Sequence, residues 1–347
     1  MNRRLILCFL AILIFLPCRA SAGEYAIDVH ARGKACPGTT LFAETMDPRR
    51  PKIVEVDMDG RVVWEYAVPQ DIARGGRPGQ AMDVEWIPDT DHILFVMPFK
   101  GIFEVDRQGA IVWRHLTDRV SHDADRLRNG NTLYTFAWEK KGDPEVTEIT
   151  PNGDVVWQWI ASDHIAPDQR RHKGAVDRDG FAHVNGATRL DNGLTRISLR
   201  NFFTAVEVDR NGDVAWSLST LHNGRRVRYV HDPRTLPGDN LVLSTHAPQV
   251  ILVTTREGQV LHKLKKPDIH LVRAHQALPN GNILVTDVDK IMELTPNLGK
   301  VVWQLSKRGV DTVSLSGPKP GAPRHNAPRT VDPRENGFYK ARRIPAR

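Results

Sequence analysis

A short segment recurs along the chain, and this internal repeat limits the possible folds more than any other feature. It begins as Val54-Glu-Val-Asp-Met-Asp-Gly-Arg-Val-Val-Trp64 and returns as Phe103-Glu-Val-Asp-Arg-Gln-Gly-Ala-Ile-Val-Trp113. Four further copies span 147–157, 206–216, 253–261 and 292–303; the copy at 253–261 is degraded, and the last is one residue longer. Each copy alternates apolar residues, turns on Asp, Asn and Gly, and continues into a second strand, so each copy predicts a β-hairpin.

A second hairpin lies between successive copies, which gives each repeat unit four short antiparallel strands. It is clearest at 124–135 and 276–285, where the turns read Leu-Arg-Asn-Gly-Asn and Leu-Pro-Asn-Gly-Asn. Successive tryptophan positions are 42 to 59 residues apart, which is the spacing of four-stranded propeller blades. The sequence therefore predicts an all-β fold, a six-bladed β-propeller of four-stranded antiparallel blades.

The expected domain limits are a signal peptide at 1–22, the propeller at 23–316 and a basic Pro/Arg-rich tail at 317–347. With strands lettered A to D from the channel outward, the first blade has B, C and D at 39–43, 52–56 and 62–66 but no A strand before them. A strand from elsewhere must complete this blade and close the ring. We expect Asp311–Ser316 to supply it, with Tyr25–His30 as the alternative.

The N-terminus has the three parts of a Sec signal peptide. Two arginines precede the apolar run Leu5–Pro17, and Ala20-Ser-Ala22 is typical of a cleavage site. The apolar run is too short to span a bilayer. We therefore expect export to the periplasm or beyond, without stable membrane insertion after cleavage. Of three cysteines, only Cys36 would remain, so no internal disulfide is expected.

The net charge indicates the type of partner. The formal charge of +7 falls to +4 once Arg3, Arg4 and Arg19 leave with the signal peptide. A mild positive excess suits anionic small molecules and does not require a nucleic-acid partner. The sequence leaves the oligomeric state open.

One mouth of the channel is expected to collect a set of polar residues, because an A strand starts on the same rim where its B strand ends. The A-strand starts carry His122, His183 with Asn185, His231 and His275, while Met82 holds the matching place in blade two, and the B-strand ends carry Arg200 and His246. The insertion 158–180, between blades three and four, is a candidate cover for this mouth.

Other interpretations of these histidines remain open. In WD-repeat blades a similarly placed histidine holds the blade together by hydrogen bonding, and His275 fits this best. The histidines could instead bind zinc or another transition metal in a hydrolase, although Asp123 and Asp232 are the only carboxylates nearby. A non-catalytic binding propeller and a quinoprotein are further alternatives.

The tryptophans are interpreted as packing between blades. The remaining histidines are expected in solvated turns or tails: His92, His115, His222, His262, His270 and His325.

The chain resembles the bacterial arylsulfate sulfotransferases that work without a nucleotide sulfate donor and form six-bladed propellers. The resemblance rests on Pro37–Phe42, on the His-Asp strand starts with their Leu-Pro-Asn-Gly-Asn turns, and on the run from His183-Val-Asn185 to Ser198-Leu-Arg200 and Ala205–Asp209. It extends from about Pro37 to Leu305.

This resemblance implies a role for each residue of the mouth. His231 would be the nucleophile that is transiently sulfurylated, with His275 as the alternative. His183 and His122 would bind the sulfuryl group and move protons, and Arg200 would clamp the sulfate. Asn185, His275 and His246 would contact substrate. An aryl sulfate would be the donor and a phenol the acceptor, and no metal or cofactor would be required.

Overall fold

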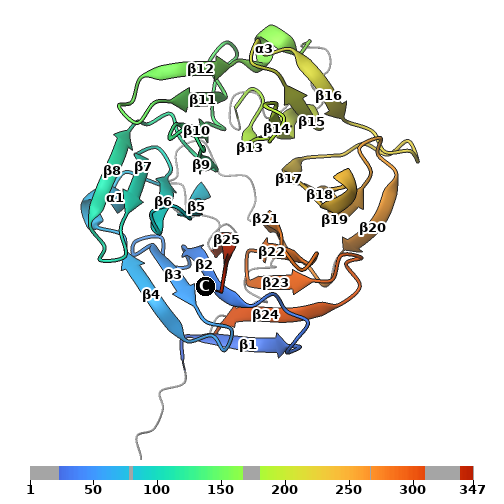
Figure 1. The fold of residues 1–347 in the computed structure, drawn as a ribbon. Helices are drawn as coiled ribbons and strands as arrows, with labels where there is room; N and C mark the ends of the chain where they lie inside the picture. Colours follow the sequence, from blue (N-terminus) through green and yellow to red (C-terminus); the bar gives the residue numbers. More distant parts are fainter. Residues whose placement is uncertain (1–22, 78–80, 167–179, 266, 309–336, 347) are drawn as a thin grey trace, which may run out of the picture.

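The computed structural model describes residues 23–77, 81–166, 180–265, 267–308 and 337–346. Six antiparallel sheets stand side by side in a ring around a central channel (Figure 1). The predicted six-bladed propeller is confirmed. The helical segments whose bounds lie within the described residues are short: α1 (Gln70–Ala73), α3 (Ala161–His164), η2 (Arg200–Phe202) and η3 (Pro237–Asp239). In the described part of the chain, no helix has the length and apolar character needed to span a membrane.

The strands follow the repeat from the channel outward. Blade one contains β25 (Phe338–Pro345), β2 (Gly38–Glu44), β3 (Lys52–Val56) and β4 (Val62–Ala67). Blade two contains β5 (Val84–Ile87), β6 (His92–Met97), β7 (Gly101–Val105) and β8 (Ile111–Leu116), and blade three contains β9 (Ala124–Arg126), β10 (Thr132–Thr135), β11 (Val146–Ile149) and β12 (Val155–Trp159).

Blades four to six continue the same order. Blade four contains β13 (Val184–Arg189), β14 (Thr195–Leu199), β15 (Thr204–Val208) and β16 (Val214–Leu218). Blade five contains β17 (Val230–Thr235), β18 (Leu241–His246), β19 (Gln249–Thr254) and β20 (Val260–Lys265). Blade six contains β21 (Val272–Ala277), β22 (Ile283–Asp287), β23 (Lys290–Leu294), β24 (Val301–Lys307) and, outermost, β1 (Tyr25–His30).

The strand that closes the ring comes from the segment expected to be a tail. β25 pairs with β2 as the innermost strand of blade one, with Thr40 opposite Arg343, and the two strands lie side by side near the C-terminus in Figure 1. β1 instead adds a fifth strand to blade six. The expected tail at 317–347 therefore ends in a propeller strand, and the donor role expected of Tyr25–His30 is wrong. Asp311–Ser316 lies outside the described residues.

The Asp-x-x-Gly element of the repeat forms the turn between the two outer strands. In blade two, Asp106 Oδ1 accepts hydrogen bonds from the backbone N–H groups of Gln108 and Ala110. Gly109 has a φ of 84°, a left-handed conformation that is costly for residues with a side chain. The aspartate thus supplies the acceptor and the glycine supplies the backbone freedom, which explains why the pair recurs with this spacing.

The repeated tryptophans link neighbouring blades, as expected. Trp64 Nε1 donates to the carbonyl of Arg107 at 2.9 Å, in the outer turn of the next blade. Four further tryptophans make the same bond, namely Trp113 to Pro151, Trp157 to Arg210, Trp216 to Arg256 and Trp303 to Met58. The degraded repeat of blade five has Leu261 instead, which is 38% exposed. Blade five therefore lacks the tryptophan bond to blade six.

Carboxylates hold the inner strands together around the channel. The N–H of Ala124 in blade three donates to Asp83 of blade two, at 2.9 Å. The N–H of Ala187 in blade four donates to Asp123 of blade three, at 2.7 Å. The N–H of His275 in blade six donates to Asp232 of blade five, at 2.6 Å. Asp83, Asp123 and Asp232 thus each join one blade to the next.

Lys340 of β25 supplies the balancing charge for two of these aspartates. Its ammonium lies 2.9 Å from Asp83 Oδ1 and also contacts Asp123. All three side chains are buried. Burial by itself disfavours the ammonium, but Asp123 and Asp83 outweigh it and raise the pKa of Lys340. The closing strand therefore pairs with β2 within blade one and links that blade to blades two and three by charge.

Lys340→Met should lower the free energy of unfolding by about 3–5 kcal/mol, because it leaves two buried carboxylates without their cation. Urea unfolding at neutral pH measures this change. The control is Lys300→Met at an exposed turn, which should stay within about 0.5 kcal/mol of wild type. Equal effects of the two substitutions would contradict the role of Lys340, and adding Asp83→Asn should restore part of the loss.

Candidate functional site

One mouth of the channel collects side chains from five of the six blades. His122 lies two residues before β9, His183 immediately precedes β13, and His231 is the second residue of β17. His275 is the fourth residue of β21, farther from this mouth, and lines the cavity at the other end of the channel. All four are buried. His246 ends β18, and Arg200 begins η2 directly after β14. Met82 fills the matching place in blade two and packs in the apolar core, so that blade adds no imidazole here.

His122 and His183 form one half of the cluster. Their ring centroids are 5.2 Å apart in an edge-to-face arrangement. Trp138 contacts both rings, at 4.9 Å from His122 and 5.6 Å from His183. Tyr339 of β25 lies 6.0 Å from His122. The two imidazoles are therefore fixed by aromatic neighbours on two sides.

His231 and His246 form the other half. Their rings are stacked, with centroids 3.6 Å apart. His246 Nε2 donates to the carbonyl of Val272 at 2.9 Å, which fixes the tautomer of that ring. His231 Nε2 is buried and has no hydrogen-bond partner among the described residues. The stacked pair thus holds His231 in place and leaves one of its ring nitrogens uncommitted.

Asn185 and His275 differ in how freely they can reach a ligand. Asn185 Oδ1 accepts a hydrogen bond from Ser198 at 2.6 Å, which leaves its buried Nδ2 without a protein partner among the described residues. His275 Nδ1 donates to the carbonyl of Asp232 at 3.0 Å, and its backbone N–H binds the Asp232 carboxylate. The geometry gives His275 a place in the interface between blades five and six.

Two arginines set the electrostatics of the cluster. Burial is the largest cause that lowers the pKa of His122, His231 and His246, and the positive charges of Arg200 and Arg273 lower all three further. The pKa of His246 falls to about 3. The imidazoles are therefore neutral at pH 7, and the net positive field comes from the guanidinium groups. A buried cationic site lined by neutral imidazoles suits an anionic ligand.

Left-handed backbone recurs at the mouth. The φ angles are 68° at His122, 53° at His183 and 52° at Tyr229. Such angles are uncommon for residues with side chains and persist where neighbouring bonds enforce them. At His183 the carboxylate of Glu139 supplies such bonds, because it accepts from the N–H groups of Ala182 and His183 at 2.5 and 3.0 Å.

Three side chains of this site were missed by sequence reasoning. Arg273 lies two residues before His275 on β21, and its guanidinium lies 5.5 Å from the Tyr339 ring. Because alternate strand residues share a face, the position of His275 was a usable signal for Arg273. Trp138 follows β10, in the loop before β11. Tyr339 was missed because its strand was expected to be a tail.

Several histidines expected in solvated turns or tails lie in strands or make specific bonds. His92 in β6 bonds Glu104 at 2.7 Å, and His115 in β8 stacks on Trp113. His262 is exposed but belongs to β20, and His270 bonds Asp289. Those four placements correct the prediction. His222 is exposed in a turn, as expected, and His325 lies outside the described residues, as do 167–179 of the expected mouth cover.

The mouth histidines do not form a metal-binding cluster in the described part of the chain. No three of them bring their ring nitrogens, with or without a carboxylate, within 4.8 Å of one another. The nearby aspartates, Asp123 and Asp232, are engaged by Lys340 and by Arg234. This arrangement does not favour the metal-dependent hydrolase interpretation.

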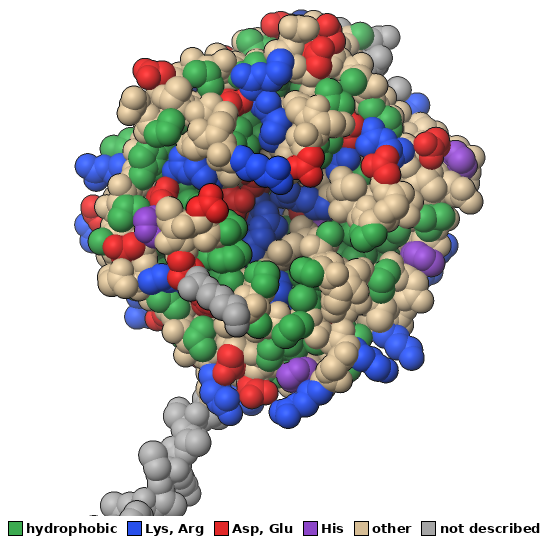
Figure 2. Space-filling view, viewed as in Figure 1, with side chains coloured by type: hydrophobic (Ala, Val, Ile, Leu, Met, Phe, Trp, Pro, Cys, Tyr) green, Lys and Arg blue, Asp and Glu red, His purple; other side chains and the backbone are tan. Residues whose placement is uncertain are grey.

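The end of the channel where the A strands finish is also rich in arginine. A cavity of about 730 Å³ opens there, with Arg126, Arg189 and Arg234 facing Glu85 and Asp125 in its wall. Figure 2 shows Lys and Arg side chains gathered around a central hollow with acidic side chains between them. Arg126, Arg189 and Arg234 pair with Glu104, Glu148 and Asp232. His275 lines this cavity, whereas His122, His183, His231 and His246 do not.

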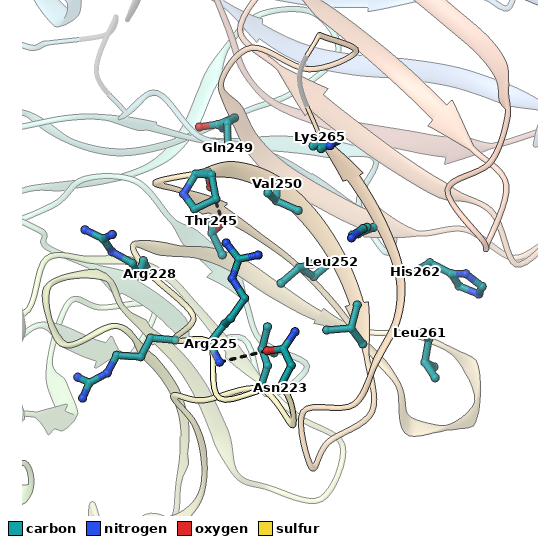
Figure 3. A pocket seen from close by; sticks show the side chains of 15 residues that line it. Asn223, Arg225, Arg228, Thr245, Gln249, Val250, Leu252, Leu261, His262 and Lys265 are labelled. Carbon is teal, nitrogen blue, oxygen red and sulfur yellow. Dashed lines mark hydrogen bonds between the residues drawn. The ribbon is translucent and has the colours of Figure 1, made fainter.

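A second groove, of about 960 Å³, lies on blade five (Figure 3). Val250, Leu252 and Leu261 form an aliphatic wall, and Arg225 and Arg228 stand along its edge. None of the five channel histidines lines it. Neither cavity is lined by His122, His183, His231 or His246; the imidazole cluster is the candidate site because it gathers these histidines beside Arg200 and Arg273.

The fold and this site define a class: a six-bladed propeller with a buried cluster of neutral imidazoles beside arginines. The model of the arylsulfotransferase (ASST) family matches residues 32–225, which is more than half of the chain. The protein belongs to this family. The match includes His122, His183, Asn185 and Arg200, whereas His231 lies just beyond it.

Solved structures share the fold at low sequence identity. A protein of unknown function from Bacteroides caccae is 18% identical, with a TM-score of 0.57 over 78% of this chain and 94% of that chain. A streptogramin B lyase is 12% identical, with a TM-score of 0.52 over 83% and 88%. The virginiamycin B lyase of Staphylococcus aureus is 13% identical, with a TM-score of 0.51 over 83% and 90%. No curated protein matches the chain.

Arg273→Gln should raise the pKa values of His122, His231 and His246 toward the ordinary histidine value, because it removes a positive charge that opposes their protonation. NMR titration of the imidazole resonances between about pH 3 and pH 8 measures the shift. Arg61→Gln, at an exposed turn of blade one, is the matched control and should leave these values unchanged. Unchanged values in Arg273→Gln as well would contradict the electrostatic account.

Proposed function

We propose that this protein is an arylsulfate sulfotransferase that transfers a sulfuryl group from an aryl sulfate to a phenolic acceptor through a sulfohistidine formed on His231. One observation carries the proposal above the others: the buried His231 ring stacks on His246 and has an Nε2 without a hydrogen-bond partner among the described residues. Burial and the charges of Arg200 and Arg273 lower its pKa, which favours the neutral ring. A protonated imidazole has no lone pair for attack, whereas a neutral one does. The family match supports the reaction class.

In the first half-reaction a ring nitrogen of His231 attacks the sulfur of the aryl sulfate. The new N–S bond forms as the S–O bond to the aryl group breaks, and the phenolate oxygen leaves with that electron pair. The remaining N–H proton of the now cationic ring balances the phenolate. Arg200 and Arg273 stabilise the charge on the sulfuryl oxygens, since a planar guanidinium can donate two hydrogen bonds to an oxyanion.

In the second half-reaction a phenol attacks the same sulfur. His122 or His183 accepts the phenol proton, work suited to a neutral imidazole. The new O–S bond forms as the N–S bond breaks, and that electron pair returns to His231. Asn185, whose Nδ2 is uncommitted, donates to a substrate oxygen, while the stacked His246 keeps the His231 ring oriented. His275 supports β21 from the interface between blades five and six.

His231→Ala should abolish the covalent intermediate. Wild-type protein is mixed with excess 4-nitrophenyl sulfate and no acceptor, quenched rapidly and weighed intact. We expect one sulfuryl adduct per chain with an equal burst of nitrophenol, both absent in His231→Ala. The matched control His222→Ala changes an exposed histidine and should behave as wild type.

Two other results of this experiment would change the assignment. An adduct that persists in His231→Ala but vanishes in His275→Ala would move the nucleophile to His275. Neither adduct nor burst with any simple aryl sulfate would overturn the catalytic proposal in favour of a non-catalytic binding propeller.

We also propose that the protein acts after export, with cleavage after Ala22. Support comes from the arginines, the apolar run and the Ala-Ser-Ala site at residues 1–22. N-terminal sequencing of the protein recovered from expressing bacteria measures the start of the mature chain. Gly23 as first residue supports export, and recovery in the cytoplasm with residues 1–22 attached would contradict it.

A further inference from the structure

A cluster of three side chains lies on blade six, apart from the channel histidines. His270 precedes β21, Asp287 ends β22, and Asp289 lies in the turn that leads into β23. One potential ligand atom from each residue lies within 4.8 Å of those of the other two. Because β22 runs antiparallel to β21, its end and the start of β21 lie on the same rim as the imidazole cluster.

Asp289 has an unused acceptor in this cluster. Its Oδ2 lies 2.7 Å from His270 Nδ1, but its Oδ1 is buried and has no hydrogen-bond partner among the described residues. The residue is only 3% exposed. Burying an unpaired carboxylate oxygen is costly. The Oδ1 of Asp289 is therefore an acceptor available to a bound cation.

Asp287 is held in a fixed orientation. Its Oδ1 accepts from the N–H groups of Leu271 and Val288, at 2.5 and 2.8 Å, and its Oδ2 accepts from the N–H of His270 at 2.6 Å. Hydrogen bonds of this kind commonly position the carboxylates that bind metals, because the oxygens keep further lone pairs. Backbone N–H groups thus hold the carboxylate of Asp287 in place, whereas the carboxylate of Asp289 keeps one oxygen without a partner among the described residues.

The local charge favours a cation. Within the described residues, neither carboxylate forms an ion pair with Lys or Arg. This contrasts with Asp83 and Asp123, which share Lys340. The two adjacent buried carboxylates therefore lack the lysine charge that Asp83 and Asp123 have.

We propose that His270, Asp287 and Asp289 bind a divalent metal ion at the rim of blade six. One imidazole and two carboxylates suit first-row ions such as Zn²⁺ or Mn²⁺ better than Ca²⁺, whose sites are built from oxygen. A cation bound between His270 Nδ1 and Asp289 Oδ2 takes the place of the proton they now share, and water completes its coordination.

The position of the site gives the ion a structural role. It would tie the loop before β21 to the β22–β23 turn. β21 carries Arg273, and the carbonyl of Val288 in that turn accepts a hydrogen bond from the N–H of Phe338, next to Tyr339. Metal binding therefore stabilises the segments that bring Arg273 and Tyr339 to the mouth, while none of its ligands belongs to the imidazole cluster.

The test is metal binding by the whole mature chain, independent of activity. Protein is treated with a chelator, exchanged into metal-free buffer, and titrated with Zn²⁺ or Mn²⁺ in separate calorimetric experiments. Metal content after gel filtration gives the stoichiometry, and thermal unfolding with and without metal gives the stabilisation. The variants are Asp289→Asn and His270→Gln, with His122→Ala as the control in the channel cluster and His222→Ala at the surface.

We expect one ion per chain in wild type and both controls, and at least about tenfold weaker binding with no thermal stabilisation in Asp289→Asn and His270→Gln. If Asp289→Asn does not fold, His270→Gln decides alone. Three results would overturn the proposal: no stoichiometric binding of either ion, unchanged binding in the blade-six variants, or binding lost only in His122→Ala.

Discussion

The charged hydrogen bonds around the channel are the interaction on which the rest of this structure depends. Asp83, Asp123 and Asp232 each accept an amide of the following blade, and these bonds join blades two to three, three to four and five to six. Because Asp83 and Asp123 share Lys340, their mutual repulsion becomes attraction to the closing strand. Removal of a partner from a buried pair costs far more than the loss of a surface ion pair. The insertion of β25 therefore both closes the ring and supplies the positive charge that neutralises the buried aspartates of its interior.

The sequence repeat predicted the strands that follow one another along the chain, but it did not predict the strand that closes the ring. Strands B to D of the first blade lie within one residue of their expected bounds because alternation and turn residues act over short distances. β25 was missed because it is far along the chain from its partner β2, in a stretch whose Pro and Arg content resembles a tail. Its sequence does contain the signal: Tyr339 and Lys340 match the order of His122 and Asp123, with one residue at the mouth and the next at the inner interface.

The positions of the mouth histidines followed from the repeat, but their chemistry did not. Register places a side chain on a rim, whereas its pKa depends on burial and on charges contributed by other blades. His122 of blade three is made less basic by Arg273 of blade six and Arg200 of blade four. The same field lowers the pKa of the imidazoles and attracts an anion. The same two arginines would therefore attract the anionic sulfuryl group and keep the nucleophilic imidazole neutral.

At the interface between blades five and six, His246 and His275 have structural roles, in contrast to the candidate nucleophile His231. Leu261 replaces the tryptophan that joins every other described pair of neighbouring blades, so this interface lacks an outer hydrogen bond. The inner side compensates with three bonds, from the His275 amide and ring to Asp232 and from His246 to the Val272 carbonyl. Each of these two imidazoles is committed to a neighbouring blade through one ring nitrogen. His231 precedes both in the sequence and stacks on His246, and its Nε2, like that of His275, has no protein partner among the described residues. A ring held by its faces and free at a nitrogen is oriented without losing its lone pair, which is the requirement for a nucleophile.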